Sequence, residues 1–361
     1  MDPQFENRKR EHIQQSLNPL NQSTGLSGLD DVRLAHEALP ELNFEDLTIE
    51  SECLGKPSHT PFFVCGMTAG HADAPTLNRL IAASCQNRGW AMGVGSQRRD
   101  FEVLRGKSAA GYHSVDHWKS FRTDFPRLTL LGNLGISQLI DASIDDVRKL
   151  VDLIEASALC VHVNAMQEAI QPEGTPHFRG ALKALETLCA KLGVPVVLKE
   201  TGCGFSSNTL VRLKNVGLAA IDVSGLGGTH WGRIEGSRAE SGSLQQRAAV
   251  TFGNWGETTV DSVVAAKNVL GSGGAGGTEI WASGGVRSGL DAAKLIALGS
   301  KQVGYAQPVL KAALGGEAVL DSWMKQMEFE LKVALFCTGS SSPTALRGKS
   351  GICSIKKNNS N

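Results

Sequence analysis

Polar side chains that could bind a metal or handle a substrate follow an apolar run near the middle of this 361-residue chain. His162 and Asn164 are two residues apart, the repeat of an extended strand, so both should point to the same side. A lone histidine can equally be a satisfied core residue. Glu168 offers a carboxylate, and Mg²⁺ prefers one or two carboxylates together with substrate phosphate and water. Its neighbour Gln167 is no efficient base at neutral pH and would instead orient a substrate.

Lys199 ends the most apolar run of the chain, Val194–Leu198. At the end of a parallel strand this lysine would face the mouth of a pocket. There its ammonium group could stabilise negative charge on a reduced isoalloxazine ring. The alternatives are a solvated lysine after the strand and a salt bridge to the neighbouring Glu200.

Three segments suggest anion binding. Ser283–Gly285 and Ala306–Gln307 are tight turns that follow the last two apolar runs. Backbone N–H groups and helix N-termini bind phosphate at such turns in α/β barrels, although glycines can also merely turn the chain. The third segment, Arg8–His12, is basic. It is either a solvated helix or an arm that folds over a diphosphate through bidentate arginine contacts.

Eight short apolar runs, most of them followed by a helical pattern, must position these side chains. The runs are Phe62–Cys65, Trp90–Val94, Leu128–Leu131, Leu159–Val163, Val194–Leu198, Ala220–Val223, Glu279–Ala282 and Gln302–Tyr305. Helices are predicted at Pro75–Arg88, from Ser143 to about Glu155, and at Asp291–Leu298. Alternating strands and helices favour parallel pairing, and eight such units favour an α/β fold closed into a (β/α)8 TIM barrel. An open, doubly wound sheet is the alternative.

The pattern divides the chain into three parts. Residues 1–60 form an N-terminal arm and extension, residues 61–346 form the barrel, and residues 347–361 form a flexible tail rich in Ser, Lys and Asn. The long gap at about 224–278 predicts a lid insertion between the sixth strand and the sixth helix, at the face where barrel active sites lie. Trp231 and Trp255 lie in this lid as cover or interface residues.

Composition indicates a soluble cytoplasmic protein. Lys and Arg together number 36, as do Asp and Glu, so the formal net charge of zero implies no long-range attraction to nucleic acid or to an anionic membrane. The eight cysteines include no C-x-x-C pair, which favours reduced thiols over a disulfide framework. The N-terminus is polar, and no apolar run approaches the roughly 18 residues needed to span a bilayer.

Taken together, nine motifs resemble those of the type 2 isopentenyl-diphosphate isomerases, in the same order, from Arg8 to about Gly339. They are R-K-R-E-H-I, G-M-T-A-G, G-S-Q-R, L-G-N-L-G, H-V-N-A-M-Q-E with P-E-G after it, V-L-K-E-T-G-C-G, I-D-V-S-G-L-G-G-T, A-S-G-G-V-R-S-G and G-Y-A-Q-P. The chain departs from the family at Ala69, where Gly is common, at Gln307, where Arg is frequent, and at Glu257, where an Ile-Pro pair usually follows W-G. These changes touch the fit of the flavin and the shape of the lid.

The resemblance implies a homo-oligomer, a tetramer or octamer, that interconverts isopentenyl and dimethylallyl diphosphate with reduced FMN, Mg²⁺ and NADPH or NADH as reductant. It implies catalytic roles for Gln167, His162, Asn164 and Lys199. The implied flavin contacts are Met67, Thr68, Ala69, Ser96, Asn133, Lys199, Ser224, Thr229, Gly285, Val286, Arg287, Ala306 and Gln307. The implied substrate contacts are Arg8, Lys9, Ser96, Gln97, Arg98 and Gln167, with Glu168 as the metal ligand.

Two other functional classes are compatible with parts of the sequence. Another FMN-dependent barrel could oxidise a 2-hydroxy acid with His162 as base, or a nucleotide with Cys203 as nucleophile. A non-catalytic flavin- or phosphate-binding module would need neither. The presence of Gln167, Glu168 and Arg98 argues against the module.

Overall fold

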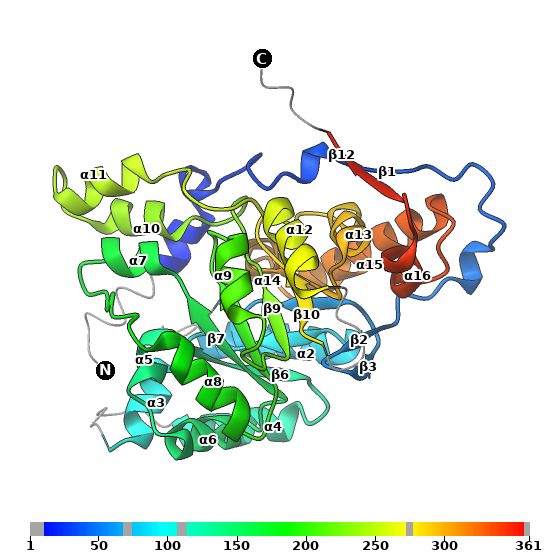
Figure 1. Cartoon of the computed structure of the whole chain (residues 1–361). Helices are drawn as coiled ribbons and strands as arrows, with labels where there is room; N and C mark the ends of the chain where they lie inside the picture. The colour runs from blue at the N-terminus through cyan, green and yellow to red at the C-terminus, as the bar shows by residue number, and fades with distance from the viewer. Residues whose placement is uncertain (1–10, 68–73, 107–113, 272–276, 357–361) are drawn as a thin grey trace.

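The computed structural model describes residues 11–67, 74–106, 114–271 and 277–356, and Figure 1 shows their arrangement. Eight parallel strands close into a barrel in the order β10-β11-β4-β5-β6-β7-β8-β9. They are β4 (Phe62–Val64), β5 (Ala91–Gly93), β6 (Leu130–Gly135), β7 (Ala158–Val163), β8 (Val196–Glu200), β9 (Ala220–Asp222), β10 (Glu279–Ala282) and β11 (Gln302–Tyr305). Each predicted apolar run overlaps one of these strands. The predicted barrel is therefore confirmed, and the open sheet is wrong.

Helices surround the barrel, and most follow a strand. They are α2 (Ala74–Arg88), α3 (Arg98–Leu104), α4 (Ser114–Asp124), α5 (Ile136–Ile140), α6 (Ile144–Leu153), α7 (Ala165–Ile170), α8 (Ala181–Lys191), α9 (Ser207–Leu213), α12 (Thr259–Leu270), α13 (Gly289–Leu298), α14 (Gln307–Leu314), α15 (Glu317–Cys337) and α16 (Pro343–Gly348). Local sequence sets their ends. Ser143 caps α6 by accepting a hydrogen bond from Asp146 N, and Gly299 ends α13 with a φ of 130°.

Successive side chains of each strand point to opposite sides of the barrel wall, so the apolar residues form one layer outside the barrel strands and one inside them. In β4, Phe62 packs in the layer between strands and helices, whereas Phe63 belongs to the cluster inside the barrel. Trp281 and Leu131 join Phe63 in that inner cluster, which fills the barrel as side chains of alternating strands do in this fold. The barrel is thus a packed core, and a ligand has room only at its end.

A hairpin covers the N-terminal end of the barrel. It consists of β2 (Ser51–Cys53) and β3 (Lys56–Ser58). The carboxylate of Glu279, at the start of β10, accepts hydrogen bonds from Leu54 N, from Gly55 N and from Trp281 Nε1. Lys301 Nζ lies 3.3 Å from Glu279 Oε1. These bonds leave the opposite, C-terminal end of the strands for a ligand site.

The tail after residue 346 is more ordered than predicted. β12 (Cys353–Ile355) pairs antiparallel with β1 (Val32–Leu34) of the N-terminal extension. The prediction relied on polar composition, which does not reveal backbone pairing with a distant segment. The structure therefore gives a short paired strand, Cys353–Ile355, in the segment where the composition predicted a flexible tail.

The lid insertion is shorter than predicted, because α12 belongs to the helical layer of the barrel and packs against α9. The insertion proper follows β9 and holds α10 (Trp231–Arg238) and α11 (Leu244–Thr251). In Figure 1 these two helices lie beside α7 and the blue N-terminal segment. None of the helices described has both the length and the apolar character that crossing a bilayer requires.

Candidate active site

A cavity of about 660 Å³ lies at the C-terminal end of the barrel strands, a volume within the range of small-molecule sites. Most of the predicted site residues line it: Met67, Ser96, Arg98, Asn133, His162, Gln167, Glu168, Lys199, Ser224, Thr229, Gly285, Val286, Arg287, Ala306 and Gln307. Four others, Arg8, Lys9, Thr68 and Ala69, lie outside the described residues. Residues far apart in the sequence therefore meet in one cavity, as strand ends do in a barrel.

One wall of the cavity is made of closely packed backbone. Gly284 and Gly285 have φ values of 97° and 77°, which residues other than glycine rarely adopt. A Cβ on Gly285 would lie 2.6 Å from the carbonyl oxygen of Gly227. Next to this turn α14 begins at Gln307, and its N-cap residue, Ala306, offers no side-chain cap. The wall thus combines a glycine cradle with a helix N-terminus, which fits the phosphate of a flavin nucleotide.

Lys199 lies in β8 beside Asp222 of β9, and only 8% of its surface is exposed. Ser283 Oγ donates a hydrogen bond to Asp222 Oδ1 at 2.8 Å. Burial raises the pKa of Asp222 to about 6, although Lys199 and the Ser283 hydrogen bond oppose the shift. The ammonium group of Lys199 is therefore held in a mostly dry wall, where a positive charge acts strongly on an anionic ring edge.

Asn133 fixes the ring of His162. Its amide nitrogen donates to Val94 O at 2.9 Å, so its oxygen faces His162 Nδ1, 2.8 Å away. Because that oxygen can only accept, Nδ1 of His162 carries a proton. Nε2 is therefore the ring nitrogen of His162 that can accept a proton.

Two predicted site residues lie behind the cavity wall rather than in it. Asn164 caps α7, where its Oδ1 accepts from Gln167 N and its Nδ2 donates to Thr201 Oγ1 at 2.8 Å. The strand ends at Val163, so the period of two no longer applies at Asn164. Gln97 is 2% exposed, and its Oε1 accepts from Asn133 N. Neither lines the cavity, and each positions a neighbour that does.

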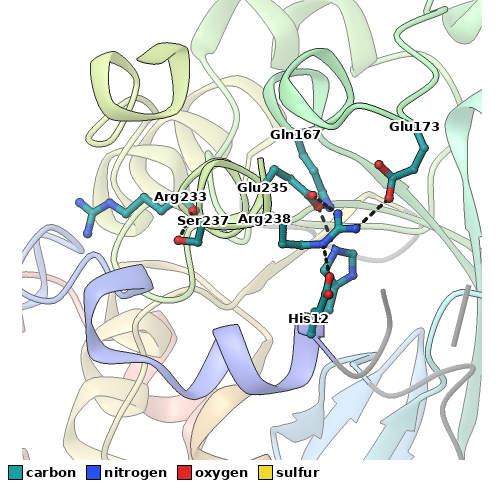
Figure 2. A network of polar contacts seen from close by, with 8 residues as sticks. His12, Gln167, Glu173, Arg233, Glu235, Ser237 and Arg238 are labelled. Atoms are coloured by element: carbon teal, nitrogen blue, oxygen red, sulfur yellow. Dashed lines mark hydrogen bonds and ion pairs between the residues drawn. The ribbon is translucent and has the colours of Figure 1, made fainter. Parts of the chain in front are cut away.

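Behind the cavity-lining residues His12 and Gln167 lies a charged cluster that sequence reasoning missed (Figure 2). Glu235 of α10 is fully buried, and its Oε1 accepts from Gln167 Nε2 at 3.0 Å and lies 3.1 Å from His12 Nε2. Its Oε2 pairs with Arg238 Nη1. Burial would raise the pKa of Glu235, but the His12 and Gln167 hydrogen bonds and the Arg238 charge bring it below its ordinary value. Glu235 is therefore a buried carboxylate anion.

Similar proteins show the family to which the chain belongs. Residues 137–351 match the family described as FMN-dependent dehydrogenase. An isopentenyl-diphosphate delta-isomerase of Legionella pneumophila is 51% identical over 337 residues, which are 93% of this chain and 95% of that protein. One from Bdellovibrio bacteriovorus is 46% identical over 353 residues, 97% of this chain and 98% of that protein. The chain belongs to the isopentenyl-diphosphate delta-isomerase family.

Solved structures agree with this family in fold. A flavocytochrome b2 mutant has a TM-score of 0.68 at 17% identity and covers 96% of this chain and 82% of its own. A mandelate oxidase solved with an FMN adduct has a TM-score of 0.62 at 17% identity, covering 96% of this chain and 92% of its own. The isomerase family thus shares its barrel with FMN-dependent oxidoreductases, and the resemblance inferred from the motifs is confirmed.

The predicted metal position in this isomerase-family chain is a single carboxylate. Glu168 lines the cavity, and its Oε2 accepts from Thr175 N at 2.6 Å. Within the described ranges, no three His, Cys, Asp or Glu side chains form a group that could hold a metal. A magnesium ion at Glu168 would therefore need oxygen ligands from a phosphate or water.

Cys203, the nucleophile of the alternative nucleotide-oxidising reaction, is poorly suited to that role. Burial and the nearby Glu200 raise the pKa of its thiol. A thiol is a good nucleophile only as the thiolate, which a raised pKa disfavours. Cys203 is also absent from the cavity lining, unlike its neighbours Thr201 and Gly202.

Proposed function

We propose that this protein interconverts isopentenyl diphosphate and dimethylallyl diphosphate with FMN in its barrel-end cavity. One observation carries the proposal. The glycine cradle and Lys199 line the same cavity as Gln167 and Glu168, so a flavin site and a site for a polar, metal-bound tail adjoin each other. In its reduced form FMN supplies an electron-rich ring and an exchangeable proton beside the alkene.

The protein residues have complementary roles in this proposal. The backbone at Gly285, Val286 and Ala306 binds the FMN phosphate, and Lys199 stabilises negative charge on the ring. Met67, Ser96, Asn133, Ser224, Thr229, Arg287 and Gln307 complete the flavin contacts. Asn164 acts through α7 rather than by touching the substrate.

The substrate lies beneath α10 and the N-terminal segment. Arg98 and the basic residues Arg8 and Lys9 bind its diphosphate, and Glu168 would hold Mg²⁺, which would neutralise part of the diphosphate charge. Gln167 orients the C5 chain. The double bond moves when a proton is added at the terminal alkene carbon and another is removed from the carbon two positions along the chain, without net oxidation.

We also propose NADPH or NADH as the source of electrons for the flavin, a tetrameric or octameric assembly, and a cytoplasmic location. The free state of all eight cysteines supports the location, because cytosolic thiols stay reduced.

The test uses purified protein supplied with FMN, Mg²⁺ and isopentenyl diphosphate after reduction by dithionite. We expect the dimethylallyl isomer to form, and we expect E168Q to lose about tenfold or more in kcat/KM because a neutral amide binds Mg²⁺ poorly. E186Q, at an exposed site on α8, is the matched control and should retain full activity. Bound FMN without turnover, or turnover of lactate or inosine monophosphate with flavin reduction, would contradict the proposal.

A further inference from the structure

Arg238 joins three carboxylates that belong to three different parts of the chain (Figure 2). Its Nε is 3.0 Å from Glu11 Oε2, and its Nη2 is 3.0 Å from Glu173 Oε1. Its Nη1 is 2.5 Å from Oε2 of Glu235 on the same helix, α10. Each nitrogen of the guanidinium group thus has its own carboxylate partner. Because the five N–H donors lie in a rigid plane, a single arginine fixes the directions of all three partners.

The three partners connect the walls of the substrate end. Glu11 begins the helical residues 11–17, whose side chains include the cavity-lining Ile13 and Leu17. Glu173 lies in the loop after α7, two residues before Thr175, which binds Glu168. Only 13% of the Arg238 side chain is exposed, and Glu235 is fully buried, whereas the Glu11 and Glu173 side chains are 52% and 39% exposed. The pair with Glu235 is therefore shielded from solvent, and the other two pairs are partly screened.

The third partner, Glu235, determines the orientation of Gln167. A carboxylate can only accept hydrogen bonds, so Gln167 must turn its NH₂ group toward Glu235 Oε1. Its carbonyl oxygen is then the atom left for a bound ligand. If Glu235 shifted or lost its charge, the amide could turn over and present a donor to the ligand instead.

We propose that Arg238 is a positioning residue for the isomerase reaction: by binding Glu235, Glu11 and Glu173 together, it fixes the Gln167 amide and holds residues 11–17 over the substrate. The inference rests on the proposed function for its kinetic consequence. Its structural part, that Arg238 orders the segments around residues 11 and 173, is independent of the proposed function.

The same helix supplies a matched control. Arg233 points away from Glu235 in Figure 2. Its guanidinium donates to the carbonyl oxygens of Gln22 and Gly253 and to Asn254 Oδ1. Arg233 therefore ties the lid to the N-terminal segment as Arg238 does, but without a carboxylate of the cluster.

The first experiment compares the kinetics of R238M, R238K and R233M holoenzymes. We expect R238M to lower kcat about 30-fold, since a small misplacement of a positioning group can cost up to about 10²-fold. R238K should recover only part of this loss, because an ammonium group lacks the planar fork. R233M should keep kcat within about twofold and change mainly KM or thermal stability. An equal loss of kcat in R233M would overturn the proposal.

A double variant separates positioning from general stabilisation. If Arg238 acts through Glu235, then E235Q and the R238M/E235Q double variant should have the same kcat within about threefold, because coupled residues are not additive. Losses of kcat that multiply in the double variant would overturn the proposal.

E173Q provides a milder test if R238M folds poorly. Glu173 lies at a partly exposed site, and we expect E173Q to lower kcat about threefold. An E173Q enzyme with unchanged kcat and unchanged exchange near residue 173 would count against the proposal.

Hydrogen–deuterium exchange supplies a readout that needs no substrate. We expect faster exchange at residues 11–17 and 171–175 in R238M, with the barrel strands unchanged. Unchanged exchange in these two segments would overturn the proposal even if activity fell. A wild-type protein that fails to isomerise isopentenyl diphosphate would instead refute the proposed function, while exchange still decides the role of Arg238.

Discussion

The two ends of the cavity are built in different ways. The end proposed to bind FMN, called the flavin end, is made largely of backbone, with glycines at positive φ and the start of α14, all at the ends of barrel strands. The end proposed to bind the substrate, called the substrate end, is backed by charged side chains of α10, of the α7 loop and of Glu11. The shape of the flavin end depends on close backbone packing. The shape of the substrate end depends on ion pairs between residues that are far apart in the sequence.

Two buried carboxylates, one at each end, display this difference. Glu200 ends β8, and its Oε2 accepts from the backbone N–H groups of Thr201 and Cys203. Burial raises its pKa to about 7 despite these bonds. Glu235 is equally buried but has a cationic partner in Arg238, and its pKa is lowered. Thus the backbone donors and the charge of Lys199 do not offset the burial of Glu200, whereas the hydrogen bonds from His12 and Gln167 and the charge of Arg238 do offset the burial of Glu235.

The largest effect should come from filling the glycine cradle. G285A places a Cβ 2.6 Å from Gly227 O, so the two turns must separate. We expect loss of bound FMN and a fall in activity of more than about 100-fold, because backbone donors that miss the phosphate no longer bind it. The measurement is the visible absorbance of the purified protein together with isomerase turnover.

G242A is the matched control for this prediction. Gly242 has nearly the same φ, 76° against 77°, but open space around its Cβ position. Both variants bear the left-handed strain of about 1–2 kcal/mol, so only the contact differs. Full flavin retention by G285A, or equal loss in G242A, would show that the packed backbone is not what holds the cofactor.

A smaller effect is expected from removing the charge at the flavin end. We expect K199A to bind FMN more weakly and to lose about 100-fold in kcat, the scale seen when one group that stabilises developing charge is deleted. K301A is the control at the opposite end of the barrel, where Lys301 pairs with Glu279. It should keep the flavin and lose about 1–3 kcal/mol of stability, since Glu279 is left without that partner. A fully active K199A would remove the role proposed for Lys199.

The contrast between the two ends also explains what the sequence could predict. The strands, their closure and the flavin end follow from apolar runs that end in glycine or a polar residue, because a barrel brings all strand ends to one face. Lys199, Gly285 and Ala306 were therefore predictable from position alone. Asn164 was predicted to face the cavity with His162 because a period of two was extended one residue beyond the strand, which ends at Val163. Gln97 was implied by the resemblance alone, and the sequence does not show which way either side chain points.

The substrate end was predictable only in part. Gln167 and Glu168 follow a strand, but Glu235 lies in an insertion whose fold the apolar pattern does not determine. An acidic residue three positions before an arginine usually indicates an exposed helical pair. Nothing near residue 235 reveals that His12 binds Glu235 or that Glu11 and Glu173 bind Arg238, since these are tertiary contacts between distant segments of the chain. The pairing of β12 with β1 was missed for the same reason.

The smallest and most discriminating prediction concerns pH. The folded-state pKa of Glu200, about 7, is above its unfolded value, so the folded protein binds the extra proton and Glu200 favours folding most below about pH 4.5. That contribution to stability is lost as pH rises towards 7, by at most about 3 kcal/mol at 1.4 kcal/mol per pKa unit.

Glu235 makes stability depend on pH in the opposite direction. Its pKa is lowered, so its contribution is present above about pH 4.5 and is lost as pH falls. Urea unfolding at several pH values should therefore show that E200Q gains stability relative to wild type between pH 5 and 8. E235Q should lose least relative to wild type at acid pH, where the native carboxylate is becoming protonated. Parallel pH profiles for the two variants would mean that the two ends of the cavity do not differ in how they hold a buried charge.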